Sequence, residues 1–460
     1  MKKIAIAIAV LSSVASAETA PPSLHVEKYT MPSGLEVILA PDPTVTSVIV
    51  DVWYRVGSKD ELAGKTGFAH LFEHLMFEGS KHAPSGAFDH LLEAAGGWNN
   101  ATTDQDRTEY TEQVPSNQLA LALWLEADRM ATLGEAMDRS AVDNQRDVVK
   151  NERRQSYENA PYGMPELLLP AALWPAGHGM AHPVIGSMED LTAASLDDVL
   201  AFWRAYYLPS NATIVIAGGF DPKDARVMMD RYFGAMKAAP RPATRTLDAP
   251  VAPLDHAVSL KAEDDVSVPE VVITWRADAP YTATSSDLEI AAYLLGGGKT
   301  SRLYRRLVMK DRVAAEVFVD YEPHVLGGEI SVHAIAMDGV SAAKLAAAVK
   351  DELAKFRKAP ATADELDRAR TVLWAGRLDS LENLATRAGS INEWNAFAGE
   401  PDFLAKERAL LEGVTPERLA ATAKIWLADR AAVTLIVTPS KKHARKDEQP
   451  GDAPPRGALP

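Results

Sequence analysis

A Pro- and Ala-rich stretch at residues 237–255 separates two parts of the chain that repeat the same order of predicted elements. Clustered Pro residues between patterned segments indicate a linker. On each side, an apolar strand pattern is followed by a helical pattern and a Gly-containing turn, and a short apolar strand comes last. The opening and closing strands are Ile49–Tyr54 and Asn211–Ala217, then Val271–Trp275 and Ala432–Val437. This repeat predicts an α+β protein of two homologous α/β-sandwich-like domains, each of about 200 residues.

The repeat also sets the predicted domain boundaries. We place the first domain at residues 24–236, the linker at 237–255 and the second domain at 256–439. Residues 440–460 are charged and Pro-rich, which is typical of a disordered tail. After the N-terminal segment, no stretch reaches the roughly 18 apolar residues of a transmembrane helix, so no membrane anchor is predicted.

The N-terminal segment has the three parts of a secretory signal peptide. A basic start at Met1–Lys3 precedes an apolar run at Ile4–Leu11, and Ala15–Ala17 is a small-residue cleavage pattern. The apolar run is too short to span a bilayer, which argues against a membrane anchor; a buried strand is the other alternative. We therefore predict a signal peptide at residues 1–17, cleavage near Ala17 and export to a bacterial periplasm.

Charge and cysteine content exclude several classes of function. The formal net charge is -15, whereas binding to nucleic acid needs clustered Lys and Arg, so no nucleic-acid partner is predicted. The chain has no cysteine, which excludes disulfides, thiolate metal ligands and cysteine nucleophiles.

The segment His70-Leu71-Phe72-Glu73-His74 carries the most specific chemical signal. Residues four apart share one face of a helix, so both imidazoles can reach one ion. Glu73 lies near that face and can take a proton from a metal-activated water. A surface His/Glu cluster is the alternative reading, but the flanking residues are apolar, and buried polar side chains need partners.

A hydrolytic zinc site needs a third protein ligand. Glu152 is our candidate, although a helical Glu beside Arg residues is often only part of a solvated face. Residue types alone do not favour Glu152 over Glu126 or Glu158. A second His pair, His178 and His182, is flanked by Gly and Pro residues that break a helix, so we interpret it as part of a loop.

Taken together, several motifs resemble the pitrilysin/insulinase family of zinc peptidases, which carry the inverted His-x-x-Glu-His motif. The family includes bacterial periplasmic members and the mitochondrial processing peptidase. The matching stretches are Gly67–Ser80, Asn100–Thr103, Arg146–Glu152, Pro183–Ser187 and Asn211–Gly219. The resemblance covers most of residues 30–220, and the second half is similar in layout more than in motif.

The resemblance implies a role for each matched residue. His70, His74 and Glu152 would hold one Zn²⁺ per chain, and Glu73 would be the general base of a zinc endopeptidase. Asn100 and Ala101 would lie on an edge strand that pairs with an extended peptide substrate. Two similar domains would enclose a chamber, and the second domain would be non-catalytic.

Two positions depart from the family pattern. Relatives carry a Glu seven residues before the third ligand, where this chain has Gln145, which brings no charge to the second shell of the site. Relatives also carry an Arg and a Tyr that bind the substrate near the zinc, and those positions fall on Val308 and Ala315. We therefore predict a heterodimer in which a homologous subunit supplies the Arg/Tyr pair, with a homodimer as one alternative. A non-catalytic assembly subunit is the alternative function.

Overall fold

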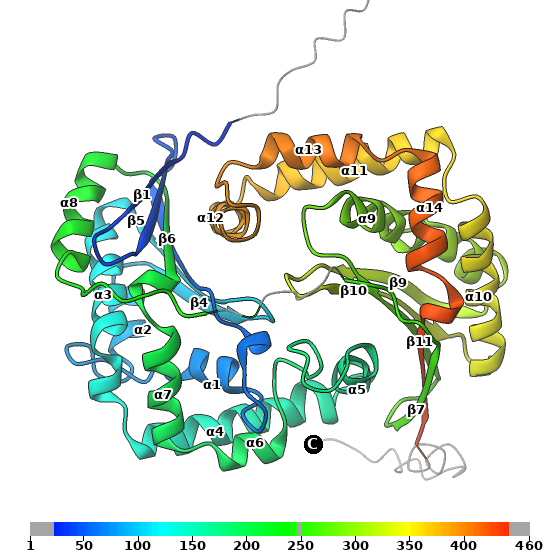
Figure 1. Ribbon diagram of the computed structural model, residues 1–460, viewed down its shortest axis with the longest axis horizontal. Coiled ribbons are helices and arrows are strands. Elements are labelled where there is room, and N and C mark those ends of the chain that lie inside the picture. Colours follow the sequence, from blue (N-terminus) through cyan, green and yellow to red (C-terminus); the bar gives the residue numbers. More distant parts are fainter. Residues whose placement is uncertain (1–22, 244, 246–250, 441–460) are drawn as a thin grey trace, which may run out of the picture.

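The computed structural model describes residues 23–243, 245 and 251–440. Figure 1 shows two halves side by side, each built around one sheet. The predicted signal peptide, and the predicted tail apart from its first residue, lie outside the described residues, so both stay predictions. Within the described ranges, none of the helices has both the length and the hydropathy that crossing a bilayer requires.

The first half contains a six-stranded sheet with the order β1-β2-β6-β3-β5-β4. Its strands are β1 (Glu27–Thr30), β2 (Glu36–Pro41), β3 (Ser47–Tyr54), β4 (Trp98–Thr103), β5 (Thr108–Pro115) and β6 (Ala212–Gly218). Its helices are α1 (Phe68–Leu75), α2 (Ala87–Ala94), α3 (Leu119–Ala136), α4 (Arg139–Arg153), α5 (Met164–Leu173), α6 (Met188–Ala193), α7 (Leu196–Tyr206) and α8 (Pro222–Phe233). Strands β2 and β6 are parallel, and the other neighbouring strands are antiparallel.

The second half contains a five-stranded sheet with the order β7-β11-β8-β10-β9. Its strands are β7 (Val258–Asp264), β8 (Glu270–Ala277), β9 (Ala314–Glu322), β10 (Gly328–Ala336) and β11 (Val433–Pro439). Its helices are α9 (Ala283–Gly296), α10 (Ala342–Lys358), α11 (Ala363–Ser380), α12 (Leu384–Glu393), α13 (Leu404–Glu412) and α14 (Pro416–Trp426). Short helical turns lie at Ser58–Asp60, Ser116–Gln118, Arg154–Glu158, Pro209–Asn211, Tyr304–Lys310, Trp394–Ala398 and Asp429–Ala431.

The two sheets have the same topology. If the strands are numbered in chain order from β2 in the first half and from β7 in the second, both sheets have the same strand order. In each half, the first and the last of these five strands in the chain pair in parallel: β2 with β6, and β7 with β11. Within the described part of the second half, the sheet has no counterpart of β1. This correspondence confirms the predicted fold class of two α/β domains.

The central strands of the first sheet are buried on both faces, which explains their continuous apolar runs. Val37 and Leu39 of β2 pack toward α1, α3 and α7, in the core of the first half. Ile38 and its neighbours on the opposite face pack against Ile391 of α12, which belongs to the second half. Each fully buried Ile or Val contributes about 1.5–3 kcal/mol relative to exposure, so this contact holds the two halves together.

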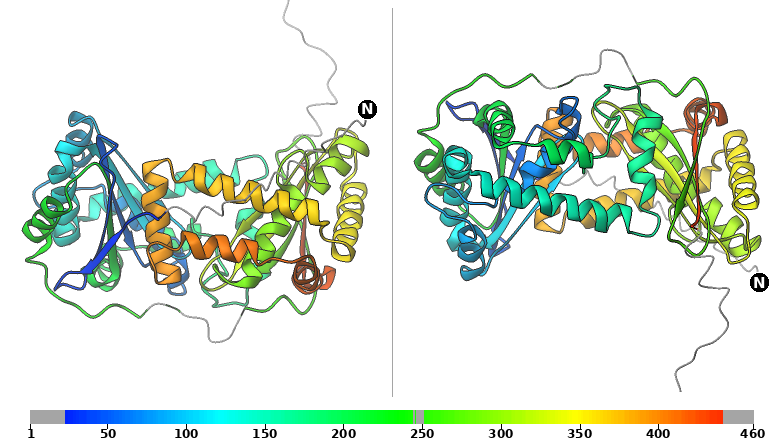
Figure 2. Two further views of the ribbon diagram at one scale, coloured as in Figure 1. Left: turned by 90° about the horizontal axis from the view of Figure 1, so that it is seen from above. Right: turned by 90° about the horizontal axis from the view of Figure 1, so that it is seen from below.

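Helix α5 makes the reciprocal contact. It lies in the first half of the sequence, but Leu169 and Leu173 belong to the core built on the second sheet. Figure 2 shows α12 (orange) beside the strands of the first half, and α5 beside those of the second. Each half therefore covers one face of the other half's sheet. The sequence pattern did not predict this exchange, because periodicity shows that a helix has an apolar face but not which sheet covers it.

Candidate metal centre and substrate edge

Helix α1 is fixed at its first turn by a buried carboxylate. Glu61 accepts hydrogen bonds from the backbone N–H groups of Gly67 (2.9 Å) and Ala69 (2.7 Å). Gly67 has φ +88°, and a Cβ there would lie 2.8 Å from the carbonyl oxygen of Ile185, so only glycine fits without strain. The start of the helix that carries His70 is thus set by its contacts with Glu61 and with the backbone at Ile185.

The sequence of α1 divides it into an apolar face and a polar face. Phe68, Leu71, Phe72 and Leu75 are buried in the core of the first half. The helical repeat then places His70, Glu73 and His74 on the opposite side. The rings of the two histidines lie edge to face, with their centroids 4.8 Å apart.

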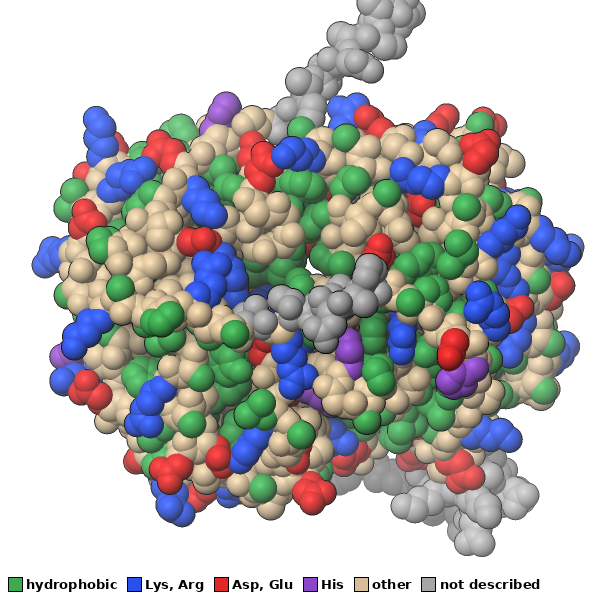
Figure 3. Space-filling view, in the orientation of Figure 1, with side chains coloured by type: hydrophobic (Ala, Val, Ile, Leu, Met, Phe, Trp, Pro, Cys, Tyr) green, Lys and Arg blue, Asp and Glu red, His purple; other side chains and the backbone are tan. Residues whose placement is uncertain are grey.

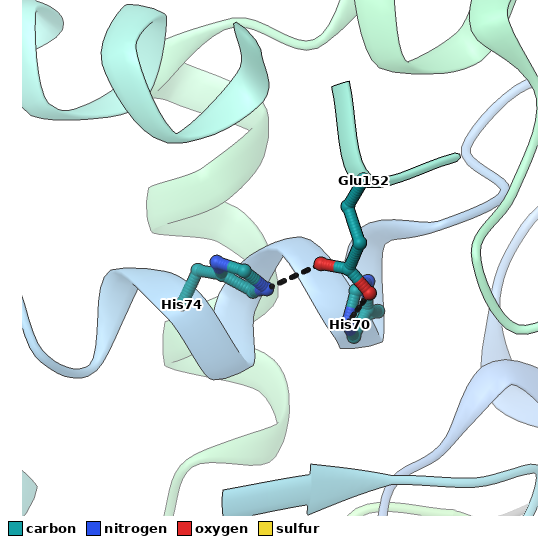
Figure 4. Close-up of side chains that lie close together, drawn as sticks. All are labelled: His70, His74 and Glu152. Atoms are coloured by element: carbon teal, nitrogen blue, oxygen red, sulfur yellow. Dashed lines mark ion pairs between the residues drawn. The ribbon is translucent and has the colours of Figure 1, made fainter. Parts of the chain in front are cut away.

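Glu152 of helix α4 lies between these two histidines, as Figure 4 shows. Its Oε1 is 3.6 Å from Nε2 of His70, and its Oε2 is 3.3 Å from Nε2 of His74. One ligand atom from each of the three residues lies within 4.8 Å of the others. The two other glutamates considered from the sequence are engaged elsewhere: Glu126 pairs with the buried Arg129, and Glu158 with Arg153.

The spacing of these atoms fits a tetrahedral zinc ion. Two ligand atoms that each lie about 2.0–2.1 Å from one tetrahedral Zn²⁺ are about 3.4 Å apart. The distances from the Glu152 oxygens to Nε2 of His70 (3.6 Å) and of His74 (3.3 Å) are close to this value. Two imidazoles and one carboxylate are also the ligand set of many hydrolytic zinc sites, which keep a fourth position open. The residues present therefore fit the metal.

The electrostatics of the trio agree with a site built for a cation. Burial lowers the pKa of His70 to about 4, which keeps that imidazole neutral and able to bind a metal. Burial would also lower the pKa of His74, but its hydrogen bond with Glu152 and the charge of Glu73 raise it. The same hydrogen bond lowers the pKa of Glu152. His74 and Glu152 thus favour each other's charged form.

Glu73 is held beside the trio by the edge strand. Thr103, the last residue of β4, donates a hydrogen bond from Oγ1 to Oε2 of Glu73 at 2.5 Å. Burial raises the pKa of the Glu73 carboxyl above its ordinary value, a direction that suits a general base. The sequence pattern did not identify Thr103, because its contact with Glu73 depends on how α1 packs against β4.

Gln145 lies on the same face of α4 as Glu152. It donates a hydrogen bond to Glu78, just beyond the end of α1, and a second hydrogen bond with His74 favours the protonated form of that imidazole. A neutral amide in this position orients His74 but supplies no charge.

Strand β4 forms one edge of the first sheet. Among the described residues, β4 pairs only with β5, so its other edge is open to a further strand. Asn100 and Ala101 lie in the middle of β4, and both line a cavity of about 710 Å³. The opposite wall comes from the second half and includes His324 and Phe397. The cavity thus runs along the open edge, between the two halves.

Comparison with known proteins identifies the family. Residues 36–181 match the profile described as insulinase (peptidase family M16), and residues 193–373 match the profile described as the peptidase M16 inactive domain. The chain belongs to the insulinase family. Over 432 residues it is 29% identical to zinc protease PqqE of Helicobacter pylori, covering 91% of this chain and 95% of that protein. Relatives of this insulinase-family chain are thus named zinc proteases.

Two further comparisons extend this result. The crystal structure of a protease from Helicobacter pylori superposes with a TM-score of 0.85 at 26% identity, covering 91% of this chain and 100% of that chain. The mitochondrial-processing peptidase subunit beta of Blastocladiella emersonii is 26% identical over 209 residues, which are 45% of this chain and 43% of that protein. The first comparison supports the two-domain fold over nearly the whole chain.

In the second half of this insulinase-family chain, Val308 and Ala315 occupy the positions at which the resemblance leads us to expect an Arg/Tyr pair. Val308 lies in a helical turn, and Ala315 lies near the start of β9. Two of the nearby arginines are engaged in other contacts: Arg302 binds Glu365 at 2.7 Å, and Arg306 binds acidic residues of α10. A third, Arg305, is exposed.

His178 and His182 lie in the loop between α5 and α6, in agreement with the loop interpretation. His178 stacks on Trp174, with ring centroids 4.5 Å apart, and its Nδ1 accepts a hydrogen bond from the backbone N–H of Met180. The ring of His182 faces the carbonyl oxygen of the next residue. Neither belongs to the groups of metal-ligand type found among the described residues.

Asp104, Asp106 and His324 form a second group of side chains of metal-ligand type. Here cationic side chains already neutralise the carboxylates: Lys59 lies 3.7 Å from Asp106, and Arg107 lies 3.3 Å from Asp104. Asp106 also binds the second half, through Nδ1 of His324 (3.1 Å) and a backbone N–H (3.0 Å). This group therefore joins the two halves.

The contact between His324 and Asp106 predicts a pH-dependent stability. Burial would lower the pKa of His324, but the hydrogen bond and charge of Asp106 raise it. A histidine whose pKa is higher in the folded state than in the unfolded state stabilises the fold. This stabilisation is complete at pH values below the pKa of the unfolded state, about 6.5, and it is lost as the pH rises through the pKa of the folded state. We expect His324→Gln to lower the unfolding free energy by about 1–3 kcal/mol at about pH 6, and by less at about pH 9.

Urea unfolding of the wild type and of His324→Gln at both pH values measures how the loss of stability depends on pH. His256→Gln is the matched control, because His256 contacts Asp255 at 2.5 Å but is mostly exposed, so its loss should change stability little at either pH. Equal losses for His324→Gln at both pH values would contradict the prediction.

Proposed function

We propose that this chain is a zinc-dependent endopeptidase that cleaves peptides or unfolded segments, acting as the zinc-bearing subunit of a two-subunit enzyme. One observation carries the proposal. Ligand atoms of His70, His74 and Glu152 converge within 4.8 Å, and the half-buried carboxylate of Glu73 lies beside them, outside the convergent group. That arrangement provides three ligands and a separate base, as zinc hydrolysis requires.

The residues have distinct tasks in this proposal. When bound, zinc would supply a Lewis acid that polarises the scissile carbonyl and acidifies water. Glu73 takes the proton from the attacking water and passes it to the leaving amine. Thr103 keeps the Glu73 carboxylate in place at the end of β4. The open edge of β4, with Asn100 and Ala101, pairs with the substrate backbone, which makes recognition tolerant of sequence.

The partner follows from what this chain lacks. Val308 and Ala315 occupy the positions of the Arg/Tyr pair, and Arg302 and Arg306 are engaged elsewhere. A homologous subunit that carries the pair would supply the missing donors, and a second copy of this chain would not. The similarity to a protein named as a peptidase subunit supports this part of the proposal.

The purified chain alone is therefore expected to bind zinc but to cleave an unfolded peptide slowly. Losing a donor to the developing oxyanion costs about 10²–10³ in rate, so adding the homologous subunit should raise the rate by at least that factor. Cleavage of a quenched fluorescent peptide, with and without the subunit, measures the gain. Full activity of the chain alone would refute the two-subunit arrangement while leaving the zinc site untouched.

A non-catalytic assembly subunit is the alternative function. The match of the second half to a profile described as an inactive domain favours it, whereas the convergence of three ligand-type residues in the first half opposes it. Zinc analysis of the purified chain separates the two functions. About one zinc per chain supports the peptidase subunit, and a chain without zinc supports the assembly subunit.

A further inference from the structure

A second cavity, of about 420 Å³, has six cationic side chains in its lining. It lies where the first half, the linker and the turn after α12 meet. On the face drawn in Figure 3, Lys and Arg side chains gather beside the central hollow. We call this cavity the basic pocket and define it by its cationic lining residues Lys28, Arg55, Lys59, Arg107, Arg241 and Arg245. Among the described residues, its carboxylates are those of Glu36 and Asp106.

Two of these cations are paired with carboxylates of neighbouring residues that do not line the pocket. Lys59 is buried and lies 2.9 Å from Asp60. Arg107 lies 2.9 Å from Glu109 and also contacts Asp104. We infer no ligand from these two cations, because their charges are compensated within the fold.

The other side of the pocket has more positive than negative charge. Arg55, Arg241 and Lys28 share the single carboxylate of Glu36, at 2.5, 3.3 and 3.6 Å. Although burial opposes it, the charge of Arg55 and the hydrogen bond from Asn395 hold the pKa of Glu36 at about 2. One carboxylate thus faces three cations.

Arg55 shows directly that this charge is under-compensated. Its Nη2 binds Glu36 and Thr213, but its Nη1 is buried and has no hydrogen-bond acceptor among the described residues. A buried guanidinium N–H group without an acceptor destabilises the fold. A second anion that accepts a hydrogen bond from this group would remove that cost.

We propose that the basic pocket binds an oxyanion through Lys28, Arg55 and Arg241. The ligand chemistry is a carboxylate, phosphate or sulfate group, because guanidinium and ammonium groups bind oxyanions by charge-assisted hydrogen bonds. Asn395 and Phe397 of the second half line the same pocket, so a bound anion contacts both halves.

The source of the oxyanion is either a free inorganic anion or an acidic peptide. The basic pocket and the cavity along β4 share the wall formed by Trp53, Asp106, Arg107 and Phe397. A peptide in the β4 cavity can therefore place a carboxylate in the basic pocket. This inference goes beyond the proposed peptidase and does not need it, because the binding can be measured without turnover.

The test titrates the full chain with sulfate at constant ionic strength and follows tryptophan fluorescence, since Trp53 lines the pocket. We expect a saturable change, and at least about a tenfold weaker affinity in the double variant Lys28→Gln/Arg241→Gln. Both side chains are partly exposed (33% and 46%), so the fold should tolerate their replacement. The matched control is Arg226→Gln, which removes an exposed ion pair with Glu27 outside the pocket.

The controls also separate the pocket from general salt effects. Sulfate stabilises folded proteins nonspecifically, but that effect would be equal in all variants. A second titration uses acetylated tetraglutamate, with tetraglutamine as its neutral counterpart. Competition between tetraglutamate and sulfate identifies a peptide carboxylate as ligand, and binding of sulfate alone identifies a free anion. Equal sulfate affinity in the wild type and the double variant, or no saturable change, would overturn the proposal.

Discussion

Replacing Glu73 by Gln is expected to leave zinc bound and to lower peptide cleavage by at least about 10²–10⁴-fold. Glu73 is half-buried, its pKa is raised by that burial, and it is held by Thr103 next to the ligand trio. Gln keeps the size and the hydrogen bond of the side chain but cannot accept the proton of the attacking water. The loss should therefore fall on kcat, with little change in KM.

The measurement pairs zinc content with cleavage of an unfolded peptide, in the presence of the partner subunit. Glu93→Gln is the matched control, because Glu93 is an exposed carboxylate on the neighbouring helix α2. We expect it to keep both zinc and activity. A fully active Glu73→Gln variant would show that Glu73 is not the base, and an inactive variant without zinc would show a role in holding the metal.

Local sequence spacing anticipated the parts of the site that lie on one helix. The separation of His70 and His74 by four residues puts both imidazoles on one face of α1, and the apolar residues between them bury the other face. Spacing alone did not choose among the glutamates. Only the fold shows that Glu152 faces the histidines, while Glu126 and Glu158 each pair with an arginine.

The remaining features depend on contacts between segments that are far apart in the sequence. Thr103 reaches Glu73 because the end of β4 packs beside α1, and no residue pattern encodes that contact. The exchange of α5 and α12 between the halves is hidden for the same reason. The basic pocket joins residues of β1, β3, the linker and the second half. A single sequence indicates which segments form helices or strands and which of their faces are apolar. It does not indicate which distant segments come into contact, and that requires the folded structure.

The buried central strands, by contrast, could be recognised from the sequence repeat. In each half, the two strands that the repeat identified are adjacent and antiparallel: β3 with β6, and β8 with β11. Because both strands are buried in the middle of their sheet, they are the most apolar segments of each half and the easiest to recognise. Edge strands such as β4 are polar and half exposed, so their pattern was weaker.

Replacing Glu152 by Gln is expected to remove zinc from the chain and to abolish cleavage with it. Gln has no negative charge to offset that of Zn²⁺, and it is a much poorer ligand than a carboxylate. Changes in the residues that only support ligands already cost about 10–100-fold in metal affinity, so loss of a ligand itself should exceed that. The rise in melting temperature that zinc gives the wild type should also disappear, since ligand stabilisation scales with binding.

Zinc per chain after dialysis and the zinc-dependent shift in Tm measure both effects. Glu158→Gln is the matched control, because Glu158 lies in the turn after α4 and pairs with Arg153 at 2.9 Å, away from the histidines. It should keep its zinc, whereas undiminished zinc in Glu152→Gln would exclude Glu152 as a ligand. Together, Glu73→Gln and Glu152→Gln separate two functions of one site. We expect Glu73→Gln to keep the metal and lose proton transfer, and Glu152→Gln to lose the metal on which proton transfer depends.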